Sequence, residues 1–208
     1  MIKVMVIDDH IVVRAGITSL LDTDPNINVV GESKSAEEAQ GMYTSINPDV
    51  IIMDLSMPGM GGIEATKRIL ARSPNTNILV YSLHEESLYA QRAMEAGAKG
   101  YVTKASEQEV LIQAVKAVAS GQRFISPDIA SEYALKKMIQ GDDPIKLLSD
   151  REFEILVLIS KGYTTHEIAK KLHLSDKTVS NNISRFKKKL ELKTTADIVH
   201  FAIQHHLL

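Results

Sequence analysis

Short apolar runs alternate with amphipathic stretches along the first 120 residues of the chain. Apolar runs without polar alternation, such as Val50-Ile-Ile-Met53, indicate strands covered on both faces, as the strands of parallel sheets are. Strands are predicted at residues 3–8, 28–32, 49–54, 77–82 and 99–103, and helices at 11–22, 35–46, 62–72, 86–96 and 106–120. Five strand–helix repeats predict an α/β N-terminal domain, a doubly wound (βα)5 parallel sheet.

The pattern becomes entirely helical from Ile145 onward. Two segments, Ser149-Asp-Arg-Glu152 and Thr164-Thr-His-Glu167, place a hydroxyl three residues before a Glu, as in the capping boxes of helix N-termini. Ser175 is suited to cap a further helix. Helices are predicted at 150–161, 165–172, 176–190 and 195–205, with a tight turn at 173–175. We therefore expect an all-α C-terminal domain.

The segment between these two patterns is the expected linker. Gly121 ends the fifth predicted helix, and another helix is predicted from Asp128 to Gln140, behind Ser126-Pro127. Gly141-Asp-Asp-Pro144 then interrupts the chain with residues that favour turns. The expected domains are therefore 1–121 and 145–208, joined by a linker with one helix at 122–144.

The two halves of the chain differ in charge. Residues 1–120 carry 10 Lys+Arg against 15 Asp+Glu, whereas residues 145–208 carry 11 against 7, so a total of −2 conceals an acidic part and a basic part. The acidic part suits a metal or phosphate site, and the basic part suits a polyanion such as DNA.

Composition excludes several other classes of protein. The chain has no cysteine, so neither a disulfide framework nor a Cys-ligated zinc site is possible. It shows no apolar stretch of the roughly 18 to 20 residues that a membrane span needs, and its N-terminus lacks the pattern of a signal peptide. We expect a soluble cytoplasmic protein with no membrane partner.

Chemically active side chains stand at the ends of four predicted strands. Asp8 and Asp9 follow the first strand, Asp54 ends the third, and Ser82 and Lys104 come at the ends of the fourth and fifth. Open parallel sheets bind ligands at the carboxyl ends of their strands. Three carboxylates there would repel each other, and Mg²⁺ would remove that cost. A carboxylate can attack phosphorus, while the ammonium and the hydroxyl stabilise the phosphoryl oxygens.

These residues, with Met57-Pro-Gly-Met-Gly-Gly62 after Asp54, resemble the receiver domain of bacterial two-component response regulators over residues 1–120. The resemblance implies a flavodoxin-like fold in which Asp54 is the phosphoacceptor. It also implies Mg²⁺ binding by Asp9, Asp54 and the backbone of Ser56, with Asp8 completing the acidic pocket. Lys104 and Ser82 would stabilise the phosphoryl group, and Tyr101 matches the family's aromatic switch residue. Lys104-Ala105 replaces the Lys-Pro of many receivers.

One predicted helix in the basic part has two contrasting sides. Val179, Ile183, Phe186 and Leu190 recur at helical spacing and are expected to face the core. The polar side can enter a major groove, where Asn and Arg read base edges and Lys neutralises phosphates. The predicted DNA-contacting residues are Lys177, Thr178, Ser180, Asn181, Ser184, Arg185 and Lys188, with Lys189 as a further phosphate contact. With helix 165–172 and the turn, this is a helix-turn-helix.

Leu148-Ser-Asp-Arg-Glu152, Glu167-Ile-Ala-Lys-Lys-Leu172 and Ser175-Asp-Lys-Thr-Val179 resemble the LuxR-type helix-turn-helix, and the whole chain resembles a response regulator of the NarL/FixJ class. Asn182 departs from the His or Tyr of many members. The resemblance implies a transcriptional regulator in which a sensor histidine kinase phosphorylates Asp54. Phosphorylation would then free the helix-turn-helix and favour a homodimer, through the last helix (Ala196, Val199, Ala202 and Ile203), on double-stranded DNA.

Two other classes remain open. One is a Mg²⁺-dependent phosphohydrolase that uses Asp54; Ser56 stands where a second acid would be needed, and no substrate-cap insertion is present, so we expect that the protein is not an enzyme. The other is a phosphorylation-independent DNA-binding regulator whose receiver serves only for dimerisation, and the intact acidic set argues against it. The cognate kinase, the operator and the direction of regulation cannot be read from the sequence.

Overall fold

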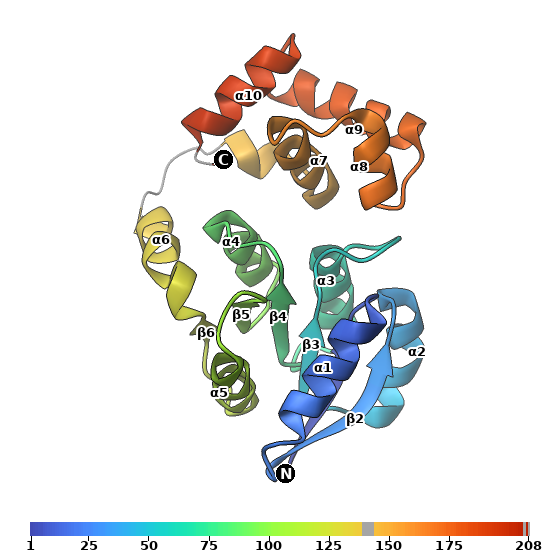
Figure 1. Ribbon diagram of the computed structural model, residues 1–208, viewed down its shortest axis with the longest axis vertical. Helices are drawn as coiled ribbons and strands as arrows, with labels where there is room; N and C mark the ends of the chain where they lie inside the picture. The colour runs from blue at the N-terminus through green and yellow to red at the C-terminus, as the bar shows by residue number, and fades with distance from the viewer. Residues whose placement is uncertain (139–143, 206, 208) are drawn as a thin grey trace. The chain divides into compact units, whose positions relative to one another are not determined.

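The computed structural model describes residues 1–138, 144–205 and 207. The chain divides after residue 139 into two compact units, the first an α/β fold and the second helical (Figure 1). Among the residues described, none of the helices combines the length and the apolar character that a membrane span requires.

Six parallel strands form the sheet of the first unit, in the order β2-β1-β3-β4-β5-β6. The strands are β1 (Ile2–Ile7), β2 (Ile27–Ser33), β3 (Val50–Met53), β4 (Ile78–Ser82), β5 (Gly100–Thr103) and β6 (Phe124–Ile125). The helices are α1 (Ile11–Leu21), α2 (Ala36–Ile46), α3 (Gly62–Arg72), α4 (Ser87–Glu95), α5 (Gln108–Ala119) and α6 (Pro127–Met138). The doubly wound fold predicted from the sequence is confirmed, and all five predicted strands are present.

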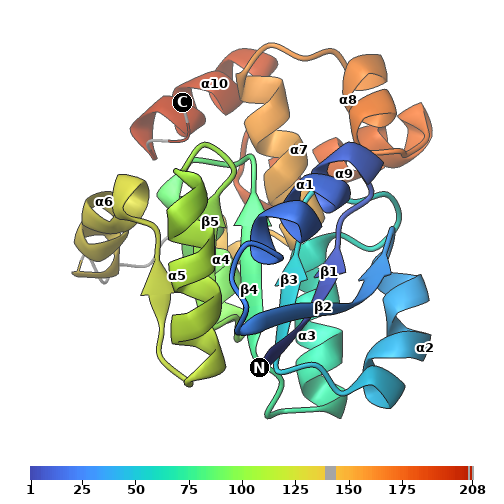
Figure 2. The same ribbon diagram turned by 60° about the horizontal axis from the view of Figure 1, so that its bottom comes forward.

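Both faces of the sheet are covered by helices, which explains the unbroken apolar runs. Figure 2 shows α1 and α5 on one side of the sheet and α2, α3 and α4 on the other. Alternate strand residues join α1 and α5 in one core cluster: Val4, Val6, Ile17, Leu21, Ile27, Val50, Ile52, Leu79, Val102, Leu111, Ala114, Val115 and Val118. Because both faces of the sheet are covered, the buried polar side chains of the strands lie at the strand ends.

The first unit extends beyond the boundary expected at residue 121. Phe124 and Ile125 pair in parallel with Gly100 and Tyr101 of β5 as the short strand β6, and α6 then packs against α4. Residues 122–138, which the sequence analysis assigned to the linker, therefore fold with the first unit. A two-residue strand carries no period that a sequence pattern could reveal. Residues 139–143 of the expected linker lie outside the described residues.

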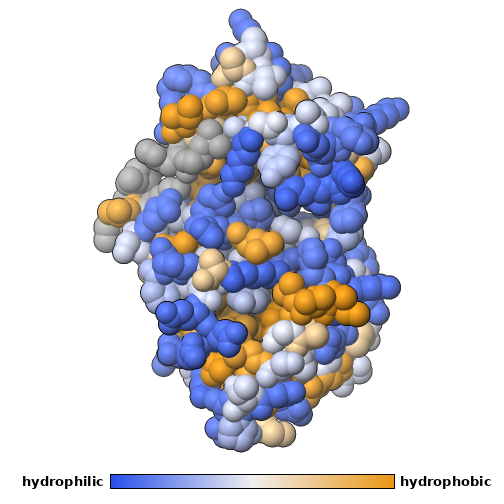
Figure 3. Space-filling model, in the orientation of Figure 1, coloured by the Kyte–Doolittle hydropathy of each residue, from blue (hydrophilic) through white to orange (hydrophobic). Residues whose placement is uncertain are grey.

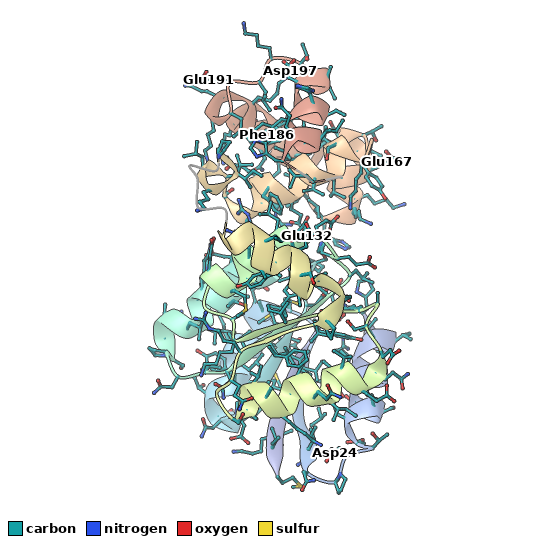
Figure 4. The ribbon with its side chains drawn as sticks, turned by 90° about the vertical axis from the view of Figure 1, so that its left-hand side faces the viewer. Asp24, Glu132, Glu167, Phe186, Glu191 and Asp197 are labelled. Atoms are coloured by element: carbon teal, nitrogen blue, oxygen red, sulfur yellow. The ribbon has the colours of Figure 1, made fainter. Side chains whose placement is uncertain are left out.

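The second unit consists of η1 (Pro144–Leu147), α7 (Asp150–Ser160), α8 (Thr165–Lys171), α9 (Asp176–Lys189) and α10 (Thr195–Gln204). Both predicted capping boxes are confirmed at the starts of α7 and α8, and Thr194 and Asp197 form a third at α10. Each box satisfies backbone amides that a first turn leaves without partners. Figure 4 labels Phe186 on α9, which is fully buried between the helices.

An ion pair between the buried Glu152 and the half-exposed Lys189 joins three elements of the second unit. Glu152 Oε2 accepts hydrogen bonds from the Ser149 backbone N–H, at 2.8 Å, and from Lys189 Nζ, at 2.6 Å. Lys189 Nζ also donates to the Leu147 carbonyl oxygen at 3.1 Å. Burial opposes ionisation of Glu152, but these hydrogen bonds outweigh it and hold the pKa of that carboxyl below its usual range. The pair thus ties η1 and α7 to the C-terminal end of α9.

We expect Glu152→Gln to destabilise the protein by about 1–2 kcal/mol at pH 7, because a charge-assisted hydrogen bond is lost while the half-exposed Lys189 stays solvated. Since the folded-state pKa of Glu152 is depressed, its stabilising contribution is present above the unfolded pKa of about 4.3 and is lost as pH falls through the lower folded value. Scanning calorimetry from pH 7 to 3 should show the two chains converging in acid. The exposed Glu191→Gln is the control, and an equal loss at all pH values would contradict the prediction.

Candidate functional site

Three carboxylates meet at the carboxyl edge of the sheet. Asp8 and Asp9 follow β1, and Asp54 follows β3, the neighbouring strand. Asp8 and Asp54 are buried, with 1% and 3% of their surface exposed. One ligand atom each from Asp8, Asp9, His10 and Asp54 lie within 4.8 Å of one another.

Lys104 places its ammonium between two of these carboxylates. Its Nζ lies 2.6 Å from Asp8 Oδ2 and 3.0 Å from Asp54 Oδ1. Burial alone would lower the pKa of Lys104, but Asp54 and Asp8 raise it above its usual value, so the ammonium stays charged. Burial raises the pKa of Asp54 in spite of Lys104. One cation therefore does not compensate the three acids, and the pocket remains short of positive charge.

The carboxylate oxygens of the cluster differ in whether a hydrogen-bond donor already occupies them. Asp8 Oδ1 accepts the His10 backbone N–H at 2.8 Å, and its other oxygen is taken by Lys104. Asp9 Oδ1 is buried and accepts no hydrogen bond from any described residue, although His10 Nδ1 lies 3.0 Å away. A buried carboxylate oxygen without a donor, beside two further carboxylates, fits Mg²⁺, which prefers oxygen ligands.

A hydroxyl and an aromatic switch candidate meet at a residue that the sequence analysis missed, His84. The His84 backbone N–H donates to Ser82 Oγ at 3.2 Å, and the Tyr101 hydroxyl donates to the His84 carbonyl oxygen at 2.7 Å. The His84 ring nitrogen Nε2 lies 2.9 Å from Ser56 Oγ. Burial raises the pKa of Tyr101, so its hydroxyl keeps its proton. The loop after β4 is thus connected both to Tyr101 and to the loop after Asp54.

The glycines after Asp54 allow α3 to begin directly against the site. A Cβ atom on Gly62 would lie 2.0 Å from the Asp54 backbone oxygen, which no side chain could tolerate without a backbone shift. Gly59 has a φ of +75°, and the next residue, Met60, donates its backbone N–H to Glu37 Oε1 at 3.0 Å. Close backbone approach at Gly62 and a positive φ at Gly59 therefore explain two of the glycines in this loop.

Helix α9 carries the predicted DNA-contacting side. The residues with exposed side chains include all seven predicted from the sequence: Lys177, Thr178, Ser180, Asn181, Ser184, Arg185 and Lys188. Val179 and Phe186 are buried, as expected, and so is Asn182, whose Nδ2 donates to the Thr178 carbonyl oxygen at 2.8 Å. Lys189 does not fit its expected role as a phosphate contact, because its ammonium is held by Glu152.

The turn before α9 gives the pair of helices its compact geometry. His173 adopts a φ of 53°, and Ser175 Oγ accepts the Thr178 backbone N–H at 3.1 Å as the cap of α9. The His173 backbone thus reverses the chain within a few residues after α8. A short turn between two packed helices, the second with a polar outer face, is the arrangement of a helix-turn-helix.

Comparisons with known proteins match both units. Residues 4–116 match the family described as response regulator receiver domain, and residues 146–202 match bacterial regulatory proteins of the luxR family. The response regulator GacA of Pseudomonas aeruginosa is 39% identical over 210 residues, which cover 100% of this chain and 98% of GacA. The chain is a two-component response regulator. The response regulator UvrY of Escherichia coli is 38% identical over 209 residues, covering 100% of this chain and 96% of UvrY.

A receiver joined to a LuxR-type domain is the organisation of the NarL/FixJ class, to which this response regulator belongs. Solved structures of similar proteins support the assignment. A LuxR-family regulator from Aurantimonas sp. is 43% identical, with a TM-score of 0.64, over 66% of this chain and 99% of its own. RcsB from Salmonella enterica, solved with promoter DNA and a phosphomimetic, is 29% identical, with a TM-score of 0.64, over 97% of this chain and 98% of its own. The phosphohydrolase alternative is therefore excluded, and the protein is a DNA-binding regulator and not an enzyme.

We expect Gly62→Ala in this response regulator to destabilise the first unit by about 1–3 kcal/mol, because the new methyl group meets backbone that cannot move freely. Urea unfolding followed by circular dichroism measures the loss. Gly41→Ala is the matched control, since nothing lies within 4 Å of its Cβ position in α2. Gly41→Ala should stabilise the first unit by about 0.5–1 kcal/mol, because Ala is favoured over Gly within a helix. Equal effects of the two substitutions would contradict the close approach at Gly62.

Proposed function

We propose that Mg²⁺-dependent phosphorylation of Asp54 by a sensor histidine kinase switches DNA binding by this response regulator. The observation that carries the proposal is the position of Lys104, whose Nζ is 3.0 Å from Asp54 and 2.6 Å from Asp8 in a buried acidic pocket. A fixed ammonium beside a nucleophilic carboxylate is what a phosphoryl group requires, because its transfer is catalysed mainly by positioning and by charge neutralisation.

The residues that would hold the metal in this proposal are Asp9, Asp54 and the backbone of Ser56, with Asp8 completing the acidic pocket. The buried Asp9 oxygen that lacks a hydrogen-bond donor supports this assignment. When bound, Mg²⁺ supplies positive charge that offsets the acids and the incoming phosphoryl oxygens.

Asp54 then acts as the nucleophile. One carboxylate oxygen forms a bond to phosphorus while the bond between phosphorus and the kinase histidine nitrogen breaks, and the electron pair returns to the imidazole. Lys104 exchanges part of its contact with Asp54 for a phosphoryl oxygen, and the Ser82 hydroxyl donates to another. The exposed side chains of Ile11 and Val12, which follow His10, offer apolar surface for the kinase in this proposal. Figure 3 shows hydrophobic residues gathered in patches on one face, without identifying these two.

The phosphoryl group adds a charge of about −1.5 to −2, which would reposition Ser82 and Lys104 at the ends of β4 and β5. Tyr101 responds with them because its hydroxyl is bonded to the loop that follows Ser82. In this proposal the rearrangement frees the helix-turn-helix and favours a homodimer. Along α10 the side chains of Ala196 and Ile203 are exposed and Val199 is half-buried, so they suit a dimer contact, whereas Ala202 is buried in its own unit and does not.

The DNA contacts in this proposal come from the exposed side of α9. RcsB, a structural relative, is described as bound to promoter DNA in the presence of the phosphomimetic BeF₃⁻. Asn181 and Arg185 would read base edges, and Lys177 and Lys188 would neutralise phosphates. In this proposal the protein acts in the cytoplasm, where it would meet both the kinase's phosphohistidine and DNA.

A second candidate function is regulation of DNA binding by a receiver that serves only for dimerisation. Labelling with a phosphodonor distinguishes it from the phosphorylated switch. That function needs no phosphoacceptor, so the acidic pocket would take no phosphoryl group. The buried acidic pocket, in which Lys104 lies beside Asp54 but does not compensate all three carboxylates, favours the phosphorylated switch.

Asp54→Asn should abolish base-labile labelling by acetyl phosphate and Mg²⁺, because the amide is not a nucleophile, while the fold is retained. Mass spectrometry of the intact chain counts the added phosphoryl groups, and circular dichroism checks the fold. Asp49→Asn, at the opposite end of the same strand, is the control and should be labelled as the unchanged chain is. Full labelling of Asp54→Asn would exclude Asp54 as the phosphoacceptor.

Asn181→Ala and Lys188→Ala should weaken DNA binding in different ways. On a duplex selected by the protein from a random pool, Asn181→Ala should lose about 1–3 kcal/mol, with little change on a scrambled duplex, because an amide reads a base edge. Lys188→Ala should weaken binding to both duplexes and reduce the salt slope by about one, because it displaces a counterion from phosphate.

Fluorescence anisotropy from low to moderate salt measures both effects. Lys34→Ala, which removes one positive charge from the first unit, is the control for net charge. Equal losses on the two duplexes for Asn181→Ala would show that Asn181 does not read bases.

A further inference from the structure

Helix α6 is tied to the first turn of α4, directly after the loop that carries Ser82 and His84. The Ser87 hydroxyl donates to Glu132 Oε1 at 2.7 Å. Ser87 is fully buried, whereas Glu132 lies on an exposed turn of α6, where Figure 4 labels it. This bond is a long-range contact of 45 residues along the chain, so it is a feature of the tertiary structure and not of local helix formation.

The same helix is tied to the end of β5, next to Lys104. Thr103, the residue before Lys104, donates its buried hydroxyl to Asp128 Oδ2. Ser106 Oγ, in the turn after Lys104, lies 3.3 Å from Asp128 Oδ1 and 2.9 Å from Thr103 Oγ1. Asp128 thus holds both sides of the segment that positions the Lys104 ammonium.

Backbone pairing brings α6 to the switch aromatic as well. The Ser126 N–H, one residue before α6, donates to the Tyr101 carbonyl oxygen at 2.9 Å, in continuation of the β5–β6 pairing. Tyr101 therefore has its side chain bonded to the loop after β4 and its backbone bonded to the start of α6. A shift of β5 would therefore change both the Tyr101–His84 bond and the Tyr101–Ser126 bond.

Asp128 and Glu132 are four residues apart, so they lie on one face of the helix. Through that face, α6 contacts the two elements that carry the phosphoryl-binding side chains: β5 with Lys104, and the β4–α4 segment with Ser82. In the sequence, the second unit follows directly after α6.

We propose that α6 is the output element of the receiver and that Asp128 and Glu132 are positioning residues that couple the phosphoryl site to the DNA-binding unit. The inference rests on the proposed function, because it assumes that phosphorylation of Asp54 is the input. Hydroxyl–carboxylate bonds at a surface helix suit this role, since they can break when α4 or β5 moves, and water then solvates the released carboxylate. The coupling is reciprocal, so loosening α6 also changes how the phosphoryl site is held.

The test uses the full chain and two readouts. The first is single-site labelling by acetyl phosphate and Mg²⁺. The second is the switching factor, defined as the ratio of DNA affinities with and without phosphorylation, measured on the selected duplex. We expect Ser87→Ala and Glu132→Ala each to lower the switching factor about fivefold or more, within the usual range of allosteric coupling, while both variants are still labelled. The double variant should lower the switching factor no further than either single variant does, because both substitutions remove the same bond.

Thr103→Val tests the Asp128 contact in the same way, because it removes the hydroxyl and keeps the shape. Ser131→Ala, an exposed position on α6, and Glu109→Gln, an exposed carboxylate on α5, are the matched controls and should switch as the unchanged chain does. Hydrogen exchange of residues 127–138 should change on phosphorylation in the unchanged chain, and it gives a readout that needs no variant to fold.

The outcomes separate the two proposals. Labelled variants with an unchanged switching factor, or α6 amides that exchange alike in both states, would overturn the role of α6 and leave phosphorylation of Asp54 intact. If the unchanged chain is not labelled at all, the proposed function itself fails, and the coupling inference fails with it.

Discussion

The ammonium of Lys104 holds two buried carboxylates that would otherwise repel each other. Asp8 and Asp54 each lie within 3.0 Å of its Nζ, in a pocket where burial makes an uncompensated charge costly. The compensation is incomplete, because Asp9 adds a third carboxylate. This remaining negative charge suits a divalent cation. The pocket exists only because β1, β3, β4 and β5 are neighbours in one parallel sheet and end at the same edge.

Hydroxyl groups form a second layer of contacts around this charge cluster. Ser82 lies against the loop at His84, Thr103 against Asp128, and Ser87 against Glu132. Such bonds are weaker than the ion pairs at the centre, and they join elements that belong to different parts of the fold. A strong, fixed centre surrounded by exchangeable contacts is suited to a switch, because a change of charge at the centre can redistribute the contacts without unfolding the sheet.

Helix α9 of the second unit has one buried side and one exposed polar side. The inner side of α9 buries Val179, Asn182 and Phe186, and its C-terminal end is held by the pair between Lys189 and Glu152. The outer side is left with exposed amide, hydroxyl and basic groups. Capping boxes at α7, α8 and α10 fix where the surrounding helices begin. The outer side of α9 can therefore vary in sequence without loss of the fold.

The sequence by itself determined the features that follow from local periodicity. Apolar runs located the five longer strands, helical spacing located the inner and outer sides of α9, and acids at strand ends located the pocket around Asp54. Tertiary structure alone decided which groups are partners over long distances. It joined β6 and α6 to the first unit, bonded Tyr101 to His84, paired Lys189 with Glu152 and buried Ala202. The physical reason is that burial imposes a period on each strand or helix, whereas a hydrogen bond between Ser87 and Glu132 leaves no pattern in the residues near either one.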